Sequence, residues 1–348
     1  MNESSNSKIR VTWFIPEQIQ IKIRRLLGLS VFNPNLVLPS VWIRGFQVAK
    51  YLEKSTYQIG VNTLDPPPDI AIFLRRYGPD DFQLMQQLKQ EGTRTIVDVV
   101  ANYFQTRKSA PEGYGGASGH VVHNFLKLLE MADQVWAVSP YLREQAVQVN
   151  SESYFVSDSV DPVHFDPNRF SKSENNSLLR LGWSGATEKA SELNEISPIL
   201  EDLIKLNKIR VLVITRRRPE LRFNFEYQHW DHDSFPEMIS QCDICIAPRR
   251  VINEYDLGHS HFKIGVFMSM GIPAIAGPVP SYSLLLGDGQ AGAICHSLDD
   301  WHMYLNHFIE DDTARLLAGG IARKKMKSYL TPTIVTQVTG LFQKILAN

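Results

Sequence analysis

The fold of this chain is best predicted from residues 239–282, ISQCDICIAPRRVINEYDLGHSHFKIGVFMSMGIPAIAGPVPSY. The stretch reads as a buried strand, a polar loop, an apolar helix over 263–270, and a Gly-Ile-Pro turn into a second buried strand. Alternating strands and helices are typical of an open α/β sheet, which binds ligands outside the carboxyl ends of its strands. The loop residues predicted to lie at that edge are His259, Ser260, His261 and Lys263.

The same alternation runs through the rest of the chain. Apolar runs of strand length, such as IRVTWFI at 9–15 and TRTIVDVV at 93–100, are separated by helical patterns such as 39–54. The pattern predicts an α/β protein with two Rossmann-like units, each a parallel sheet covered by helices on both faces. The polar segment that separates them is expected to be a linker, which gives a first domain 1–165, a linker 166–177 and a second domain 178–330.

Length and composition agree with two domains of a soluble protein. The 348 residues exceed what one hydrophobic core usually serves, and the net charge of -1 argues against a strongly basic nucleic-acid binder. No apolar run approaches the roughly 20 residues of a membrane span, and the start MNESSNSK lacks the form of a secretory signal, so we expect a cytoplasmic protein. Cys242 and Cys245 lie in a buried strand, which favours core thiols over a redox or metal pair.

Four segments resemble, in the right order, the glycosyltransferases of GT-B fold, and most closely the retaining family 4 group. They are ADQVWAVSPYLREQA at 132–146, VDPVHFDP at 160–167, LGWSGA at 181–186 and HSHFKIGVFMSMGIPAIAG at 259–277. The resemblance implies an acceptor domain and a nucleotide-sugar donor domain that face each other across a cleft, with a final helix, 331–348, crossing back to the first domain. It also implies retaining, metal-independent transfer of a sugar from a nucleotide diphosphate to a hydroxyl acceptor, with no cofactor besides the nucleotide-sugar co-substrate.

The donor site is expected at the start of the second domain's helices. Backbone amides and a Lys or Arg can stabilise a leaving diphosphate without a metal, and the resemblance implies this role for Lys263. Gly185 would let the backbone approach the phosphates closely. A solvated lysine and an ordinary turn are the alternatives. The other donor-site candidates are Ser184, Lys189, Arg216, Ser260, His261 and Glu254.

Three residues of the first domain are candidates for the acceptor side. Asp98 ends a predicted strand, where a carboxylate could orient an acceptor hydroxyl, although it could equally cap a helix. His120 follows the glycine-rich loop 113–119 and is a candidate by its position, because a first-domain histidine sometimes faces the donor sugar in such enzymes. Arg44 could reach phosphates or an acidic acceptor, but a surface arginine on a helix is the expected reading.

The chain departs from the family where two glutamates usually stand eight positions apart. Gly258 and Val266 occupy those positions, so the donor is held differently, with Glu254 or Asp256 as possible replacements, or catalysis is lost. The alternative function is therefore a non-catalytic GT-B relative that binds a glycan or a partner protein. A dinucleotide oxidoreductase is disfavoured because no GxGxxG follows the first strand, and a zinc site at His259 and His261 lacks a third ligand.

The expected partners are a nucleotide-sugar donor and a glycan, lipid-linked or small-molecule acceptor, without nucleic acid. Residues 16–29, PEQIQIKIRRLLGL, carry an apolar helical stripe flanked by Lys and Arg. A basic amphipathic helix of this kind could touch an anionic membrane peripherally, as an enzyme acting on lipid-linked sugars would require. A helix packed into the core is the favoured alternative.

Overall fold

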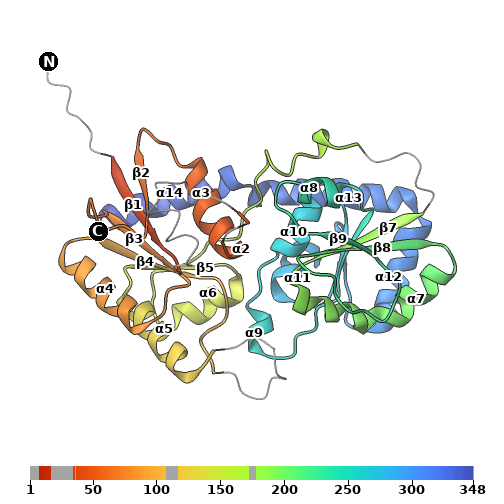
Figure 1. Cartoon of the computed structure of the whole chain (residues 1–348), viewed down its shortest axis with the longest axis horizontal. Coiled ribbons are helices and arrows are strands. Elements are labelled where there is room, and N and C mark those ends of the chain that lie inside the picture. The colour runs from red at the N-terminus through yellow and green to blue at the C-terminus, as the bar shows by residue number, and fades with distance from the viewer. Residues whose placement is uncertain (1–7, 17–33, 36, 107–116, 172–177, 348) are drawn as a thin grey trace. The chain divides into compact units, whose positions relative to one another are not determined.

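The computed structural model describes residues 8–16, 34–35, 37–106, 117–171 and 178–347. The chain forms two compact units (Figure 1). Unit 1 comprises Met1–Ser159 together with Thr331–Asn348, and unit 2 comprises Val160–Leu330. Each unit contains one six-stranded parallel sheet, which confirms the predicted α/β class. The segment 16–29 lies outside the described residues, apart from Pro16.

The sheet of unit 1 has the strand order β2-β1-β3-β4-β5-β6. Its strands are β1 (Ile9–Phe14), β2 (Tyr57–Val61), β3 (Ile70–Leu74), β4 (Arg94–Val99), β5 (Gln134–Ala137) and β6 (Ser153–Phe155). The helical elements of this unit are α2 (Pro39–Val41), the π-helical turn η1 (Trp42–Phe46), α3 (Gln47–Tyr51), α4 (Pro79–Gln90), α5 (Gly119–Met131), α6 (Pro140–Val147) and α14 (Thr331–Ala347).

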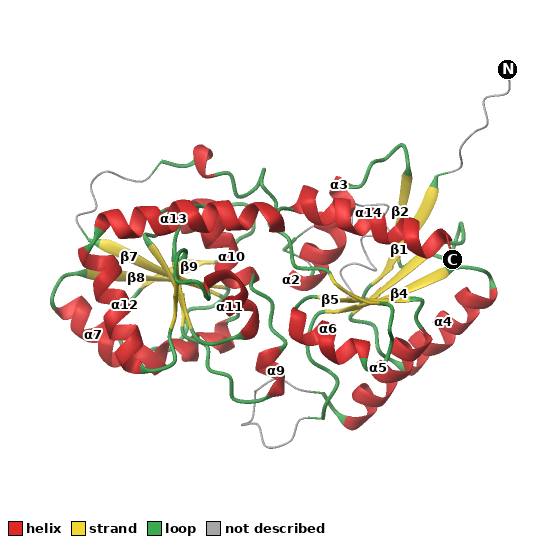
Figure 2. Ribbon diagram, turned by 180° about the vertical axis from the view of Figure 1, so that it is seen from behind, coloured by secondary structure: helices red, strands yellow, loops and turns green. Residues whose placement is uncertain are grey.

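Helices cover both faces of this sheet because successive strand residues point to opposite sides (Figure 2). On β3, Ile72 belongs to the core shared with α3 and α14, whereas Phe73 belongs to the core shared with α4, α5 and α6. The apolar side of α14, with Val338 and Phe342, is buried in the first of these cores. The C-terminal helix therefore packs on the sheet that begins the chain.

The sheet of unit 2 has the order β12-β11-β10-β7-β8-β9. Its strands are β7 (Leu179–Ser184), β8 (Ile209–Thr215), β9 (Glu226–His229), β10 (Ile244–Ala247), β11 (Ala274–Ala276) and β12 (Gly292–Ile294). The helices are the 3₁₀ segments η2 (Pro167–Arg169), η3 (Thr187–Ile196) and η4 (Lys327–Tyr329), with α7 (Ser197–Lys205), α8 (Phe235–Ser240), α9 (Glu254–Leu257), α10 (Phe262–Ser269), α11 (Pro280–Leu286), α12 (Leu298–Glu310) and α13 (Asp312–Met326).

Close packing fixes β7 against the helix α10. A Cβ atom at Gly182 would lie 2.5 Å from the sulfur of Cys242 and 2.7 Å from the ring of Phe267, so only glycine fits there. Cys242, Cys245 and Cys295 are buried free thiols, as expected of core cysteines. Burial raises the pKa of Cys295 to about 12, which keeps it a thiol at neutral pH.

The strand order of each sheet reverses at one place, between β1 and β3 in unit 1 and between β7 and β10 in unit 2. The carboxyl ends of the strands beside such a switch point leave a crevice where open α/β sheets bind ligands. In unit 2 those strand ends bring Ser184 and Gly185, after β7, beside the residues that follow Ala247, the last residue of β10.

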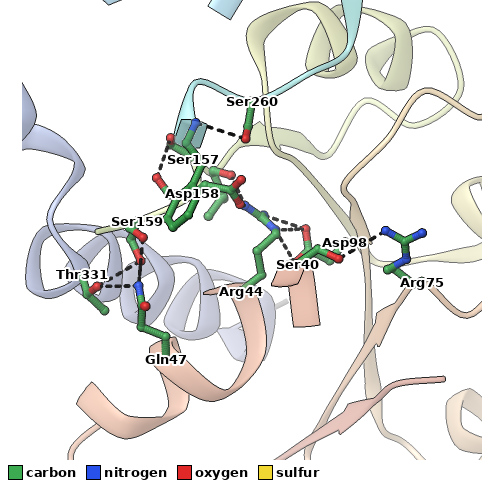
Figure 3. A network of polar contacts seen from close by, with 12 residues as sticks. Ser40, Arg44, Gln47, Arg75, Asp98, Ser157, Asp158, Ser159, Ser260 and Thr331 are labelled. Carbon is green, nitrogen blue, oxygen red and sulfur yellow. Dashed lines mark hydrogen bonds and ion pairs between the residues drawn. The ribbon is translucent and has the colours of Figure 1, made fainter. Parts of the chain in front are cut away.

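The chain crosses from one unit to the other twice, between Ser159 and Val160 and between Leu330 and Thr331, and within each unit a hydrogen bond links the residues at or next to these crossings. In unit 2, the Val160 amide donates to the Tyr329 carbonyl at 2.9 Å. In unit 1, the Thr331 hydroxyl donates to the Ser159 hydroxyl at 3.1 Å. The Gln47 amide nitrogen also donates to both hydroxyls, at 3.0 and 3.1 Å (Figure 3).

Candidate functional site

A cluster of buried charges lies at the switch point of unit 2, and Lys263 is its most unusual member. Lys263 stands in the first turn of α10, and its Nζ lies 4.3 Å from the centroid of the Trp183 ring. The nearest carboxylate oxygen, Oε2 of Glu192, is 3.5 Å away, and Nζ is buried without a hydrogen bond. Burial lowers the pKa of Lys263 to about 8. This lysine is therefore charged at neutral pH without a strong partner.

Two residues that the sequence analysis did not single out complete the centre of this cluster. Arg249 follows β10, and its Nη2 donates to Oε1 of Glu192, on η3, at 2.8 Å. The side chains are 6% and 5% exposed, so the pair is removed from water. Burial acts to raise the pKa of Glu192, but Lys263 and Arg249 lower it below its usual value. Glu192 is thus a carboxylate between two cations.

Gly185 lies directly beside Lys263. A Cβ atom added to Gly185 would lie 3.2 Å from Nζ of Lys263 and 2.9 Å from the ring of Trp183. The absence of a side chain keeps this approach to the lysine open. Ser184, which ends β7 just before this glycine, is buried. The predicted neighbours Lys263, Gly185 and Ser184 are therefore brought together.

Lys189 and Asp256 extend the cluster. Burial lowers the pKa of Lys189, and so does the charge of Arg249, while Glu192 and Asp256 act to raise it. Asp256 is 1% exposed, and its Oδ1 lies 3.7 Å from Nε2 of His259. Burial lowers the pKa of His259 to about 4, so its ring is neutral at pH 7. We call the five charged residues, Lys189, Glu192, Arg249, Asp256 and Lys263, the Lys263 cluster.

Unpartnered buried groups gather in this cluster. Within the described part of the chain, buried side-chain atoms without a hydrogen bond include Nζ of Lys263, Oε2 of Glu192, Nε of Arg249, Oδ1 of Asp256 and Nε2 of His259. Buried polar atoms are normally satisfied, and unsatisfied ones indicate an absent water, ion or ligand. With the half-buried Lys189 the cluster holds three cations against two carboxylates, and this net positive charge favours an anion.

The remaining donor-site candidates lie apart from these contacts. His261 is 1% exposed, and its ring packs 4.5 Å from that of Tyr329, so its imidazole faces the protein core rather than an open edge. Arg216 is exposed, with its guanidinium 5.1 Å from the Trp230 ring. Glu254 is exposed on the short helix α9, and Ser260 accepts a hydrogen bond from the Phe262 amide at 3.4 Å.

A second buried charge group, the Arg44 cluster (Arg44, Asp98 and Asp158), lies at the carboxyl end of the unit 1 sheet (Figure 3). The expectation of a surface arginine was wrong, because Arg44 is 4% exposed. Its Nε and Nη2 donate to Asp98 at 2.8 and 2.6 Å, and its Nη1 donates to the Val156 carbonyl at 2.8 Å. Asp158 accepts from Nη1 at 3.3 Å.

These contacts alter the expectation for the acceptor side. Both oxygens of Asp98 accept hydrogen bonds from Arg44, and the carboxylate is 1% exposed. Arg44 therefore takes the place that was expected for an acceptor hydroxyl, and Asp98 is not the cap of a helix. His120 is exposed in the first turn of α5 and does not belong to the Arg44 cluster.

The described residues contain no group of three or more His, Cys, Asp or Glu side chains arranged to hold a metal ion. No helix in the same ranges is both long enough and apolar enough to span a bilayer.

No protein-family model matches the sequence, and a search of curated proteins found no match. Solved structures do match. A glycosyltransferase from Rickettsia africae ESF-5 is 12% identical with a TM-score of 0.66, over 98% of this chain and 100% of that one. Sucrose-phosphate synthase from Thermosynechococcus elongatus is 11% identical with a TM-score of 0.62, over 98% and 100%. HepE from Anabaena, in complex with UDP and glucose, is 10% identical with a TM-score of 0.67, over 96% and 99%. The chain therefore has the GT-B fold.

Proposed function

We propose that this GT-B chain is a glycosyltransferase that moves a sugar from a nucleoside diphosphate to a hydroxyl acceptor, with retention and without a metal. The observation that carries the proposal is the Lys263 cluster, because buried cations and carboxylates with unsatisfied hydrogen bonds lie together at the switch point of unit 2. Retention and metal independence rest on the resemblance to family 4.

The chemistry assigns a role to each member of the cluster. Breaking the bond between the sugar and the diphosphate leaves negative charge on the phosphate oxygens, and prepositioned cations stabilise it. Lys263 and Arg249 would contact these oxygens, with Lys189 near them. Gly185 would admit the phosphates beside Lys263, since its missing side chain leaves that approach open. Unit 2 would thus bind the donor.

The solved structures supply the first ligands to test. HepE was solved in complex with UDP and glucose, and the pneumococcal O-GlcNAc transferase GtfA with UDP and GlcNAc. Those molecules belong to these proteins, and they make UDP and UDP-sugars the first choice for this chain. On the acceptor side we propose a glycan, a lipid-linked sugar or a small molecule, with His120 facing it. A cytoplasmic location with peripheral membrane contact through residues 16–29 stays part of the proposal.

A thermal titration tests donor binding directly. UDP, GDP and ADP are added while unfolding is followed, because a ligand at 100 times its dissociation constant adds about 2.7 kcal/mol to stability. We expect one of the three to raise the melting temperature of the wild type and to have a much smaller effect on Lys263→Ala. A folded wild-type protein that none of the three stabilises would contradict the proposal.

One observation favours a second candidate, a non-catalytic GT-B relative that binds a glycan or a partner protein. Val266 stands where the family usually carries a glutamate, and its side chain is 2% exposed within the core of unit 2. The position is therefore filled by packing and offers no hydrogen-bond acceptor. Slow hydrolysis of a nucleotide sugar by the purified protein, abolished in Lys263→Ala, would exclude this candidate.

A further inference from the structure

Glu192 stands where the proposed function would put a phosphate group. Its Oε1 accepts from Nη2 of Arg249 at 2.8 Å, and its Oε2 lies 3.5 Å from Nζ of Lys263. The carboxylate is thus in contact with both cations that would bind the diphosphate. It is 6% exposed, so solvent screens these attractions weakly.

The contact between Glu192 and Lys263 is incomplete. A charge-assisted hydrogen bond between ammonium and carboxylate normally spans 2.7–2.9 Å. At 3.5 Å neither Nζ of Lys263 nor Oε2 of Glu192 has a hydrogen bond, and Nε of Arg249 has none either. One carboxylate is therefore shared between two cations and satisfies neither fully. Such an arrangement leaves hydrogen-bonding capacity for a larger anion.

We propose that Glu192 is an internal counter-anion that partly neutralises Lys263 and Arg249 when no diphosphate is bound and gives up these contacts when a diphosphate binds. The inference rests on the proposed function. Two buried cations without an anion would repel each other and lose hydration, so the carboxylate stabilises the unoccupied site. The same carboxylate repels the incoming phosphates. Glu192 therefore stabilises the two cations when no diphosphate is bound and lowers the affinity of the site for the donor.

The cluster also provides a matched control. Glu195 lies one turn further along η3 and pairs with Arg250, the neighbour of Arg249. The Glu195 and Arg250 side chains are 38% and 65% exposed, so this pair is open to solvent, unlike Glu192 and Arg249. Replacing Glu195 with Gln removes the same charge from the same helix, outside the site. A difference between the Glu192 and Glu195 variants therefore reports the position of the carboxylate rather than the net charge of the protein.

Calorimetric titration of Glu192→Gln, Glu195→Gln and wild type with UDP, GDP, ADP and inorganic pyrophosphate tests the inference. We expect Glu192→Gln to bind pyrophosphate and the preferred nucleotide roughly tenfold more tightly, which corresponds to about 1.4 kcal/mol. Glu195→Gln should match the wild type. Glu192→Asp, which retains the charge, should lack the gain, and circular dichroism should show all three variants folded.

The outcomes separate the two proposals. If the wild type binds a nucleoside diphosphate and Glu192→Gln binds it equally or more weakly, Glu192 positions the cations and the counter-anion role is wrong, while the proposed function stands. If only Glu192→Gln binds, the carboxylate blocks the site and the inference is supported. If neither protein binds any of the four ligands, both proposals fall. Should Glu192→Gln not fold, Glu192→Ala is titrated in its place under the same criteria.

Discussion

The two charge clusters of this chain occupy equivalent positions in their sheets but differ in how completely their polar atoms are hydrogen-bonded. Both lie at the carboxyl end of a parallel sheet, and both contain a buried arginine paired with a carboxylate at 2.6–2.8 Å. In the Arg44 cluster one cation meets two carboxylates, and none of its side-chain atoms is left without a hydrogen bond. In the Lys263 cluster the cations are in excess and several atoms lack a partner.

This difference is the reason why we propose a binding role for the Lys263 cluster and a structural role for the Arg44 cluster. A buried ion pair repays the loss of hydration only when its remaining donors and acceptors are satisfied. The Arg44 cluster meets this condition and joins η1 to strand β4 and to the segment after β6. The Lys263 cluster does not meet this condition, so a bound anion would stabilise it.

The largest expected effect is the loss of stability in Arg44→Met. The substitution leaves Asp98 and Asp158 buried without their cation, and breaking such a pair costs about 3–5 kcal/mol. Arg10→Met is the control, because Arg10 and Asp69 are 36% and 34% exposed and a surface pair contributes about 0–1 kcal/mol. Urea unfolding followed by circular dichroism measures both. Equal losses in the two variants would remove the structural role of the Arg44 cluster.

Lys263→Met should affect activity instead of stability. If Lys263 stabilises the leaving diphosphate, kcat/KM for nucleotide-sugar hydrolysis should fall about 10²–10³-fold. The free energy of unfolding should not fall, because the charged form of this lysine is already disfavoured by burial. Lys208→Met, which breaks an exposed pair with Glu310, is the control and should retain activity. A variant that loses stability but keeps its kcat/KM would reverse the roles of the two clusters.

The pKa of Lys263 predicts how donor binding depends on pH. Because burial lowers this pKa to about 8, the ammonium is lost as the pH rises above 8, and UDP affinity should then decline by at most about tenfold per pH unit. Between pH 8 and 10.5 the unfolded state binds more protons at this lysine than the folded state, so its contribution to stability rises with pH. Lys263→Arg, which stays protonated, should flatten the affinity profile measured by calorimetry.

The smallest expected effect compares two glycines. A methyl group at Gly185 would press on the Trp183 ring at 2.9 Å, so Gly185→Ala should cost about 1–3 kcal/mol and weaken UDP binding. Gly340 lies within α14, and a Cβ atom there would meet nothing within 4 Å, so Gly340→Ala should gain about 0.5–1 kcal/mol. Thermal unfolding with and without UDP distinguishes them. A Gly185→Ala variant with normal UDP affinity would show that the phosphates do not approach this turn.

The sequence predicted the fold because burial on both faces of a parallel sheet leaves apolar runs that are visible without any structure. β1 and β4 are such runs, and both were predicted. The edge strand β9, EYQH, was missed, because its residues are half-buried or exposed and form no apolar run. The first domain was expected to extend to residue 165, but Phe165 is buried in the core of unit 2.

The site was harder to predict because its contacts join distant residues. Lys263 and Gly185 were named from the resemblance and Lys189 from its place after the glycine turn, and the structure brings them to one place. Arg249 and Glu192 are 57 residues apart, and their pairing leaves no local pattern in the sequence. The available signal in the sequence was that Arg249 follows a buried strand. Arg216 also follows a buried strand but is exposed, so this signal does not distinguish a buried arginine from an exposed one. Burial of an arginine depends on its partner, which only the fold supplies.

The two crossings between the units have a consequence for how the chain could be divided and recombined. The ends of unit 2 meet at the pairing of Val160 with Tyr329, and the ends of unit 1 meet at the hydroxyls of Ser159 and Thr331. Unit 2 is therefore a continuous segment inserted into unit 1 at a single point, and its first and last residues lie side by side. Two cuts at that point would allow the whole of unit 2 to be exchanged for another module, while unit 1 kept its sheet and its final helix α14.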